Sequence, residues 1–173
     1  ESASAKKHTK RGEKALEKRQ KADDEGAKAA WDTVLLSRRT DRPVAMDYSD
    51  GLFDEFIEFH GDRYFKDDGA IVGGIAMFHG MPVTVIGQQK GRNTKDNIKR
   101  NFGMPSPAGY SKALPLMKPA ETFGRPIVPI VDTPGAYSRT APAARGPGAA
   151  IARNLCPAAP LELRVAAMVL GAA

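Results

Sequence analysis

Residues 70–89, AIVGGIAMFHGMPVTVIGQQ, decide the fold of this chain. The runs AIVGGIAMF and PVTVIGQQ are apolar and rich in β-branched side chains, which is typical of strands. His79-Gly80 separates the runs, and a two-residue connection with glycine is typical of a tight β-hairpin. We therefore expect an antiparallel strand pair in this part of the chain.

The chain after this hairpin alternates between helical and extended patterns. A polar helix is expected to start at a Thr94 cap and to stop at Gly103, and Ser106-Pro107 indicates a second helix start. A strand over PIVPIVD, a helix over about residues 149–155 and a final buried strand over VAAMVLG follow. The order of hairpin, helix, strand, helix and strand predicts an α/β fold.

The region before the hairpin has a helical apolar pattern. A cap at Ser49 or Asp50 would begin a helix that ends at Gly61. Its apolar face would hold Leu52, Phe53, Phe56 and Ile57.

The first 30 residues have almost no large apolar side chains, so they are expected to form a helical or disordered extension outside the core. The packed part is expected to begin at Trp31. Residues 1–30 and 31–173 are thus predicted to be separate parts of the chain.

The composition is that of a globular protein, with 42% hydrophobic and 27% charged residues among 173. No apolar run reaches the roughly 20 residues of a membrane span, and the N-terminal segment lacks the apolar region of a secretory signal. A single cysteine, Cys156, is expected to be a buried free thiol in a reducing cytosol. The net charge of +6 suits nucleic acid, phosphate-bearing cofactors and acidic proteins equally.

The octapeptide IVDTPGAY at 130–137 contains the Asp-x-x-Gly element of GTPases. A GTPase also needs a glycine-rich loop that ends in Lys-Ser/Thr, since that loop holds the phosphates. The sequence contains neither this loop nor an Asn-Lys-x-Asp guanine reader, so a GTPase is excluded. The turn could instead direct main-chain N–H groups at an oxyanion, or it could be an ordinary connection between a strand and a helix.

A basic segment over residues 88–114 could form the rest of a binding cleft. Its cations are interrupted by NFGM, a mixture that suits an anionic and partly apolar ligand, although a basic run is also typical of a solvated surface. The cations ahead of NFGM are Lys90, Arg92, Lys95, Lys99 and Arg100.

Together these motifs make the chain resemble the carboxyltransferase alpha subunit of bacterial-type acetyl-CoA carboxylase. The resemblance runs from Trp31 to Leu155 and rests on DRPVAMDY, LFDEFIEFHGDRYFKDDGAIVGGIA, PVTVIGQQKGRNTKDNIKRNFGMPSP, GRPIV, VDTPGAY and AIARNL. It implies a crotonase-like fold of ββα units, incomplete at the C-terminus, in which residues 31–173 are the N-terminal portion of the carboxyltransferase domain.

The resemblance also implies an activity, the transfer of a carboxyl group from carboxybiotin on a carrier protein to acetyl-CoA, giving malonyl-CoA for fatty acid synthesis. The implied partners are a zinc-bearing beta subunit and the biotin carboxyl carrier protein, in an α2β2 assembly. No metal on this chain, no membrane and no nucleic acid are expected. The location would be the cytoplasm, or the plastid stroma in a eukaryote.

The resemblance assigns candidate site residues by their place in these motifs. The expected catalytic residues are Gly135, Ala136 and Arg145. The expected substrate-binding residues are Lys90, Arg92, Arg100, Asn101, Phe102, Gly103, Met104 and Tyr137.

The sequence departs from the family pattern after Pro105. Pro115 and Pro119 lie inside an expected helix, Pro129 lies inside an expected strand, and prolines disfavour both. The chain also ends before the glycine-rich turn of the family's oxyanion hole. A non-catalytic binding or scaffold module of the same fold is therefore an alternative, as is a subunit of another biotin-dependent acyl-CoA carboxylase or decarboxylase.

Overall fold

The computed structural model describes residues 20–21, 23–61, 66–135, 137, 147–158 and 162–171. The chain divides into two compact units, residues 1–39 and 40–173. In the first unit, residues 23–37 form a helix in which Trp31, Leu35 and Leu36 are all about half exposed. The predicted division at Trp31 stays a prediction, since this helix belongs to the first of the two units.

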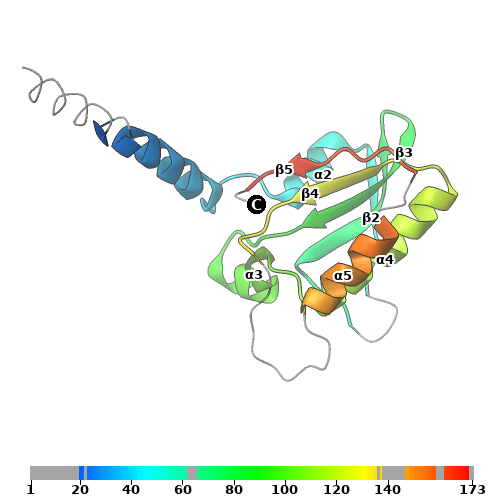
Figure 1. The fold of residues 1–173 in the computed structure, drawn as a ribbon. Helices are drawn as coiled ribbons and strands as arrows, with labels where there is room; N and C mark the ends of the chain where they lie inside the picture. Colours follow the sequence, from blue (N-terminus) through cyan, green and yellow to red (C-terminus); the bar gives the residue numbers. More distant parts are fainter. Residues whose placement is uncertain are drawn as a thin grey trace, which may run out of the picture. The chain divides into compact units, whose positions relative to one another are not determined.

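The second unit contains a five-stranded sheet in the order β1-β2-β3-β4-β5 (Figure 1). Strands β1 (Glu55–Glu58), β2 (Ile71–Phe78) and β3 (Met81–Gln88) pair antiparallel. Strands β4 (Ile127–Val131) and β5 (Met168–Val169) continue the sheet in parallel with β3. This mixed sheet, with helices between its parallel strands, confirms the predicted α/β class.

The predicted hairpin is confirmed as the connection between β2 and β3. Phe78 pairs with Met81, so His79 and Gly80 alone form the turn. Both have positive φ angles, 47° and 78°, as two-residue turns of this kind require.

The helices of this unit are α2 (Ala45–Leu52), α3 (Thr94–Lys99), α4 (Pro107–Thr122) and α5 (Pro147–Ala158), with a short 3-10 turn η1 (Asn101–Gly103). Helix α4 begins after Ser106 as predicted. Helix α3 is capped by Asn93, whose side chain accepts the Asp96 N–H, so its predicted Thr94 cap is one residue too late. Among the described residues, no helix is both long and apolar enough to cross a bilayer.

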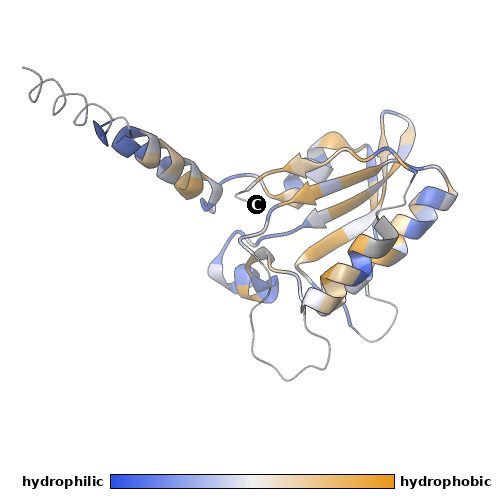
Figure 2. Cartoon of the chain, viewed as in Figure 1, coloured by the Kyte–Doolittle hydropathy of each residue, from blue (hydrophilic) through white to orange (hydrophobic). Residues whose placement is uncertain are grey.

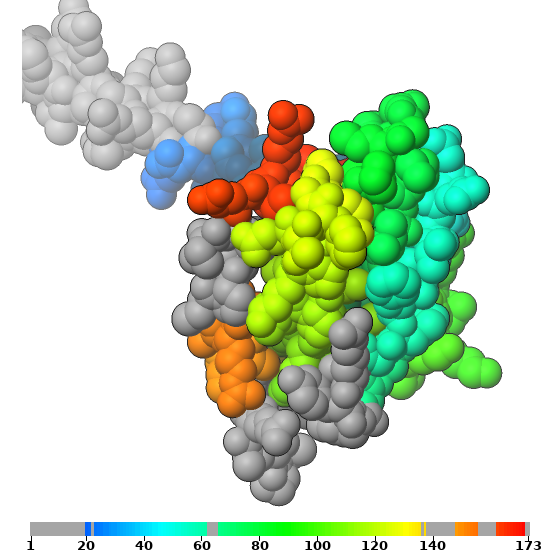
Figure 3. All heavy atoms as spheres, turned by 90° about the vertical axis from the view of Figure 1, so that its right-hand side faces the viewer, coloured from blue at the N-terminus to red at the C-terminus, as the bar shows by residue number. Residues whose placement is uncertain are grey.

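Two apolar clusters lie on opposite faces of the sheet. Helix α2 covers one face, and α4 with α5 beside it lies on the other (Figures 1 and 3). The strands between them are the most apolar elements, whereas α3 is mainly hydrophilic (Figure 2). The α2 cluster contains Ala45, Phe53, Ala76, Val83, Val85 and Ile130, and the α4 cluster contains Ile71, Ile86, Ala113, Leu116, Ala120 and Ile127.

The helix predicted to start at Ser49 or Asp50 and to end at Gly61 is wrong. Helix α2 ends at Leu52, and Glu55–Glu58 form strand β1, which pairs with β2. Phe56 packs against the α2 cluster while Ile57, the next residue, is 61% exposed. The apolar spacing fitted a helix, but pairing with an existing strand edge and alternate burial favoured a strand.

Pro129 is accommodated within β4, in contrast to the expectation that it would interrupt the strand. The Ile127 N–H donates to the Arg164 carbonyl on the β5 side, and alternate residues point the same way. The nitrogen of Pro129 therefore also faces β5, which pairs over only two residues. Val169 in this edge strand is 62% exposed, so the final strand is not buried as predicted.

Candidate functional site

Asp132 lies where β3 and β4 end at the same edge of the sheet. It follows β4 directly, and its side chain is fully buried. Oδ1 accepts hydrogen bonds from Arg42 Nη2 at 2.5 Å and from Lys90 Nζ at 2.8 Å. The carboxyl ends of parallel strands are the usual location of ligand sites in α/β folds.

The surroundings of Asp132 leave one of its oxygens without a partner. The Asp132 N–H donates to Gln88 Oε1 at 2.9 Å, but Oδ2 is buried and has no hydrogen bond within the described part of the chain. Gly171 lies so close that an added Cβ would be 2.6 Å from Oδ1. The carboxylate therefore lies among residues at the ends of β3, β4 and β5.

The 3-10 turn η1 packs onto this strand edge in a left-handed conformation. Asn101, Phe102 and Gly103 have φ angles of 47°, 55° and 74°. A Cβ at Gly103 would lie 2.7 Å from Lys90 Cγ and 3.1 Å from the Asp132 carbonyl oxygen, so only glycine fits. The Met104 N–H closes the turn by donating to the Asn101 carbonyl at 3.0 Å. We call Lys90, Phe102, Gly103, Asp132 and Gly135 the strand-end site.

The Asp-Thr-Pro-Gly turn extends the strand-end site beyond Asp132. The Gly135 N–H donates to Thr133 Oγ1 at 3.1 Å, and the same hydroxyl donates to the Gly135 carbonyl at 2.8 Å. Gly135 has a φ of 152°, which favours glycine. Its N–H is therefore occupied by the turn itself and becomes available to an oxyanion only when the Thr133 hydroxyl rotates away.

The structure brings only some of the other predicted site residues to Asp132. Lys90 and Gly103 meet at Asp132, and Tyr137 is half-buried. Arg92 instead pairs with Asp47, and Arg100 bonds Asp96 at 3.2 Å and the Gly69 carbonyl at 3.1 Å. Ala136 and Arg145 lie outside the described residues.

Asp132 and two residues that bond it were missing from the predicted site residues. Arg42, Gln88 and Asp132 all bond at the strand ends. Asp132 could have been found, because a polar residue directly after a buried strand lies at its carboxyl end. Arg42 carried no such signal, since 90 positions separate it from Asp132.

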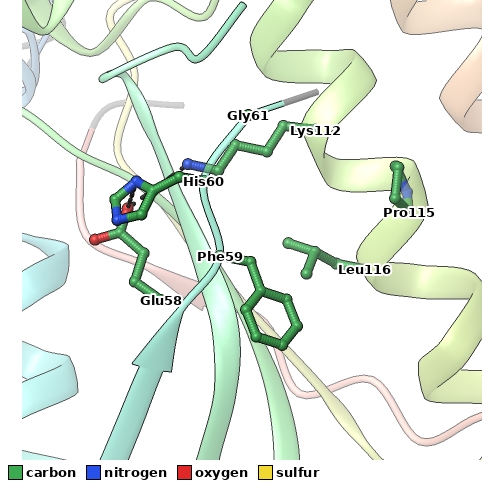
Figure 4. A pocket seen from close by; sticks show the side chains of 7 residues that line it. All are labelled: Glu58, Phe59, His60, Gly61, Lys112, Pro115 and Leu116. Carbon is green, nitrogen blue, oxygen red and sulfur yellow. Dashed lines mark ion pairs between the residues drawn. The ribbon is translucent and has the colours of Figure 1, made fainter. Parts of the chain in front are cut away.

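A second charged cluster surrounds the buried Lys112 on α4 (Figure 4). Its ammonium donates to the Ile71 carbonyl at 3.0 Å and pairs with Asp67 at 3.0 Å and Glu58 at 3.6 Å. The contacts at 3.0 Å use two of the three ammonium donors, and Glu58 lies at ion-pair distance, so the buried charge is compensated. The adjoining pocket of about 360 Å³ is lined by Glu58, Phe59, His60, Gly61, Lys112, Pro115 and Leu116. The cluster stabilises the fold by compensating the charge of the buried lysine.

This cluster makes stability depend on pH through Asp67. Partial burial raises its pKa, but the Gly61 N–H, the Lys112 ammonium and His60 together lower the pKa from 3.8 to about 2. A lowered folded-state pKa stabilises the fold above pH 3.8, and this contribution is lost as the pH falls through about 2. Because the side chain is 41% exposed, we expect no more than about 1 kcal/mol.

The measurement is a comparison of the wild type with Asp67→Asn in urea unfolding between pH 6 and pH 2. Their difference in unfolding free energy should be largest near neutral pH and should shrink as the pH falls toward 2. A difference that stays constant over this range would contradict the assignment.

Comparison with solved structures supports the predicted fold. The chain is similar to a single-chain, multi-domain long-chain acyl-CoA carboxylase, with a TM-score of 0.57 and 19% identity over 77% of this chain and 13% of that chain. At this identity the likeness concerns the fold, which is that of the crotonase-like carboxyltransferases, as predicted.

Sequence comparison identifies the family. The family described as "Acetyl co-enzyme A carboxylase carboxyltransferase-like" matches residues 2–173. The acetyl-coenzyme A carboxylase carboxyl transferase subunit alpha of Clostridium acetobutylicum is 59% identical over 82% of this chain and 52% of its own length. That of Bacillus cytotoxicus is 56% identical over 84% of this chain and 45% of its own length. The chain belongs to this carboxyltransferase family, and it spans about half the length of the curated relatives it matches.

Proposed function

We propose that this chain acts in the alpha subunit of an acetyl-CoA carboxylase carboxyltransferase. The enzyme would move a carboxyl group from carboxybiotin to acetyl-CoA and thus form malonyl-CoA. The observation that carries the proposal is the high identity to alpha subunits across the segment that builds the strand-end site. The catalytic and binding roles of the individual residues are part of this proposal.

The reaction needs groups that stabilise developing negative charge. The N–C bond of carboxybiotin breaks, the methyl carbon of acetyl-CoA loses a proton and forms the new C–C bond, and the ureido nitrogen regains a proton. Negative charge develops on the thioester oxygen and on the ureido oxygen. Fixed N–H donors and a nearby cation suit such oxyanions. The Gly135 and Ala136 N–H groups and the Lys90 ammonium would fill these roles.

The assembly follows from the same family relationship, in which relatives are named as alpha subunits. We propose a zinc-bearing beta subunit and a biotin carboxyl carrier protein as partners, an α2β2 stoichiometry and a cytoplasmic location. Acetyl-CoA and carboxybiotin would both be substrates, and this chain would supply no metal ligands.

The test is reconstitution of the full-length alpha subunit that carries this sequence with a beta subunit. The complex should form malonyl-CoA from acetyl-CoA and carboxybiotin, with a higher kcat/KM than for longer acyl-CoA substrates. A stable complex that transfers no carboxyl group would favour a scaffold role and refute the proposal. A preference for another acyl-CoA would mean that the chain belongs to a carboxylase with a different substrate.

Arg145 is the residue proposed to bind a carboxylate, either on the carboxybiotin or on the product. A guanidinium can hold a carboxylate through two hydrogen bonds in a fixed plane, whereas a lysine ammonium cannot. In the assembled enzyme, Arg145→Lys should lower kcat/KM at least about tenfold, since hydrogen bonds to charged groups contribute about 1.5–3 kcal/mol. Arg153→Lys on α5 is the matched control, and unchanged kinetics for Arg145→Lys would remove Arg145 from the site.

A further inference from the structure

The helix over residues 23–37 presents its apolar side chains to solvent. Within the described part of the chain, all of its residues are exposed except Val34 and Ser37, which are half-buried. Trp31 is 55% exposed, and Leu35, one helical turn further, is 47% exposed. A helix of this length is only marginally stable in water unless an apolar face packs against a partner. The apolar side of this helix therefore fits a second apolar surface.

A charge lies at each end of this apolar side. Residues three or four positions apart share one side of a helix, and this spacing joins a continuous stripe. We call this set the Trp31 stripe: Asp24, Ala27, Trp31, Leu35 and Arg38. Arg38 directly follows the helix, and its N–H donates to the Leu35 carbonyl at 3.1 Å, which continues the last turn. The stripe is thus acidic at its start, apolar along its centre and basic at its end.

The Trp31 stripe is symmetrical about its central residue. Asp24 and Arg38 lie seven positions before and after Trp31. Ala27 and Leu35 lie four positions before and after it. Two antiparallel copies of the helix that meet at Trp31 would therefore place each Asp24 opposite an Arg38 of the other copy. Each small Ala27 would face a large Leu35, which fills the space between the helices. The stripe is self-complementary, as a two-fold contact requires.

Charge favours this arrangement over the alternatives. A parallel pair of helices would place Asp24 beside Asp24 and Arg38 beside Arg38, and like charges repel. An acidic start and a basic end also suit the dipole of any helix. The dipole, however, does not require that both charges lie on the same stripe as an exposed tryptophan.

We propose that this helix docks antiparallel onto the same helix of a second copy of the chain, with the two Trp31 side chains in contact at the two-fold axis. The inference does not rest on the proposed function. It adds to the proposed α2β2 stoichiometry a surface through which two alpha subunits meet. Two helices of this length bury less than the roughly 1,600 Å² of a standard interface, so the association is expected in the micromolar range.

Sedimentation velocity of the 173-residue chain, from low to high micromolar concentration, tests the contact. The wild type should shift from monomer to dimer as the concentration rises. Trp31→Ala should raise the dissociation constant at least about tenfold, because an aromatic side chain at the centre of a contact carries much of its energy. Leu36→Ala is the control, since Leu36 is 58% exposed but lies off the stripe. It should stay within about twofold of the wild type.

Charge reversal tests the antiparallel orientation. Asp24→Arg and Arg38→Glu should each weaken the dimer about tenfold, because each pair occurs twice and becomes repulsive. An equal mixture of the two variants should regain the wild-type dissociation constant, since both pairs of the mixed dimer then join opposite charges. A variant that fails to fold could not be rescued in this way. Glu25→Arg makes the same charge change one residue further, off the stripe, and should have no effect beyond about twofold.

The outcomes separate this inference from the proposed function. A wild type that stays monomeric would overturn the inference, and so would a dimer that Trp31→Ala does not weaken. A mixture of the two charge variants that dimerises no better than either variant alone would refute the antiparallel pairing. Sedimentation does not depend on carboxyl transfer, so an assembled enzyme that transfers no carboxyl group would refute the proposed function only.

Discussion

Replacing Asp132 by alanine is expected to lower the free energy of unfolding by about 3–5 kcal/mol, the usual effect of breaking a buried ion pair from one side. The carboxylate is fully buried and accepts hydrogen bonds from both Arg42 and Lys90. Without it, two partly buried cations would face each other across the vacated space. Urea unfolding at neutral pH, followed by circular dichroism, measures the difference.

Two further variants separate charge from packing at this position. Asp132→Asn keeps the shape of the side chain and one acceptor oxygen, so we expect a smaller loss than for alanine. Lys90→Ala, Asp132→Ala and the double variant form a mutant cycle that gives the interaction energy of the pair. If Asp132→Ala lowered the unfolding free energy by less than about 1 kcal/mol, Arg42 and Lys90 would have found other partners. This outcome would contradict the expected cost of breaking a buried ion pair.

Local patterns were enough to predict the centre of the fold. The hairpin at His79-Gly80 could be predicted because a two-residue turn imposes positive φ angles that only a few residues accept. The start of α4 could be predicted because Ser-Pro at a helix N-terminus needs no distant partner. These features depend on residues that are close in the sequence.

Strand β1 shows why the rest of the fold could not be predicted. Phe53 and Phe56 both pack in the α2 cluster, as the expected helix would have placed them. The difference lies in Phe56 and Ile57, which alternate between inside and outside because Glu55 pairs with Met77. Pairing with the edge of β2 decides the strand conformation of Glu55–Glu58. Neighbouring residues in the sequence do not indicate this pairing.

The strand-end site shows the same limit for function. The sequence shows that the basic segment is rich in cations, but it does not show which acidic side chains pair with them. Arg92 and Arg100 pair with Asp47 and Asp96, whereas Lys90 reaches Asp132, 42 positions away. Whether a cation serves the fold or the substrate depends on such partners, so its role needs the three-dimensional structure.

The two interior prolines of α4 lead to the second large expected effect. The helix runs from Pro107 to Thr122 through both Pro115 and Pro119. A proline has no N–H, so the carbonyls of Ser111 and Pro115 lack their helical donors. Proline is about 3 kcal/mol less favourable than alanine inside a helix, and its effect on the unfolded chain offsets up to about 1 kcal/mol of this.

We therefore expect Pro115→Ala and Pro119→Ala to raise the unfolding free energy by about 2 kcal/mol each, and together by about 4 kcal/mol. Pro107→Ala is the matched control, because Pro107 occupies the first turn of the same helix, where no N–H partner is needed. It should change the stability by less than about 0.5 kcal/mol. The measurement is urea unfolding of the four variants. Equal gains at all three positions would show that the effect does not depend on the helix interior, because the unfolded-chain effect of removing a proline is destabilising. A gain below about 1 kcal/mol for the double variant would mean that restoring these two hydrogen bonds does not stabilise the helix.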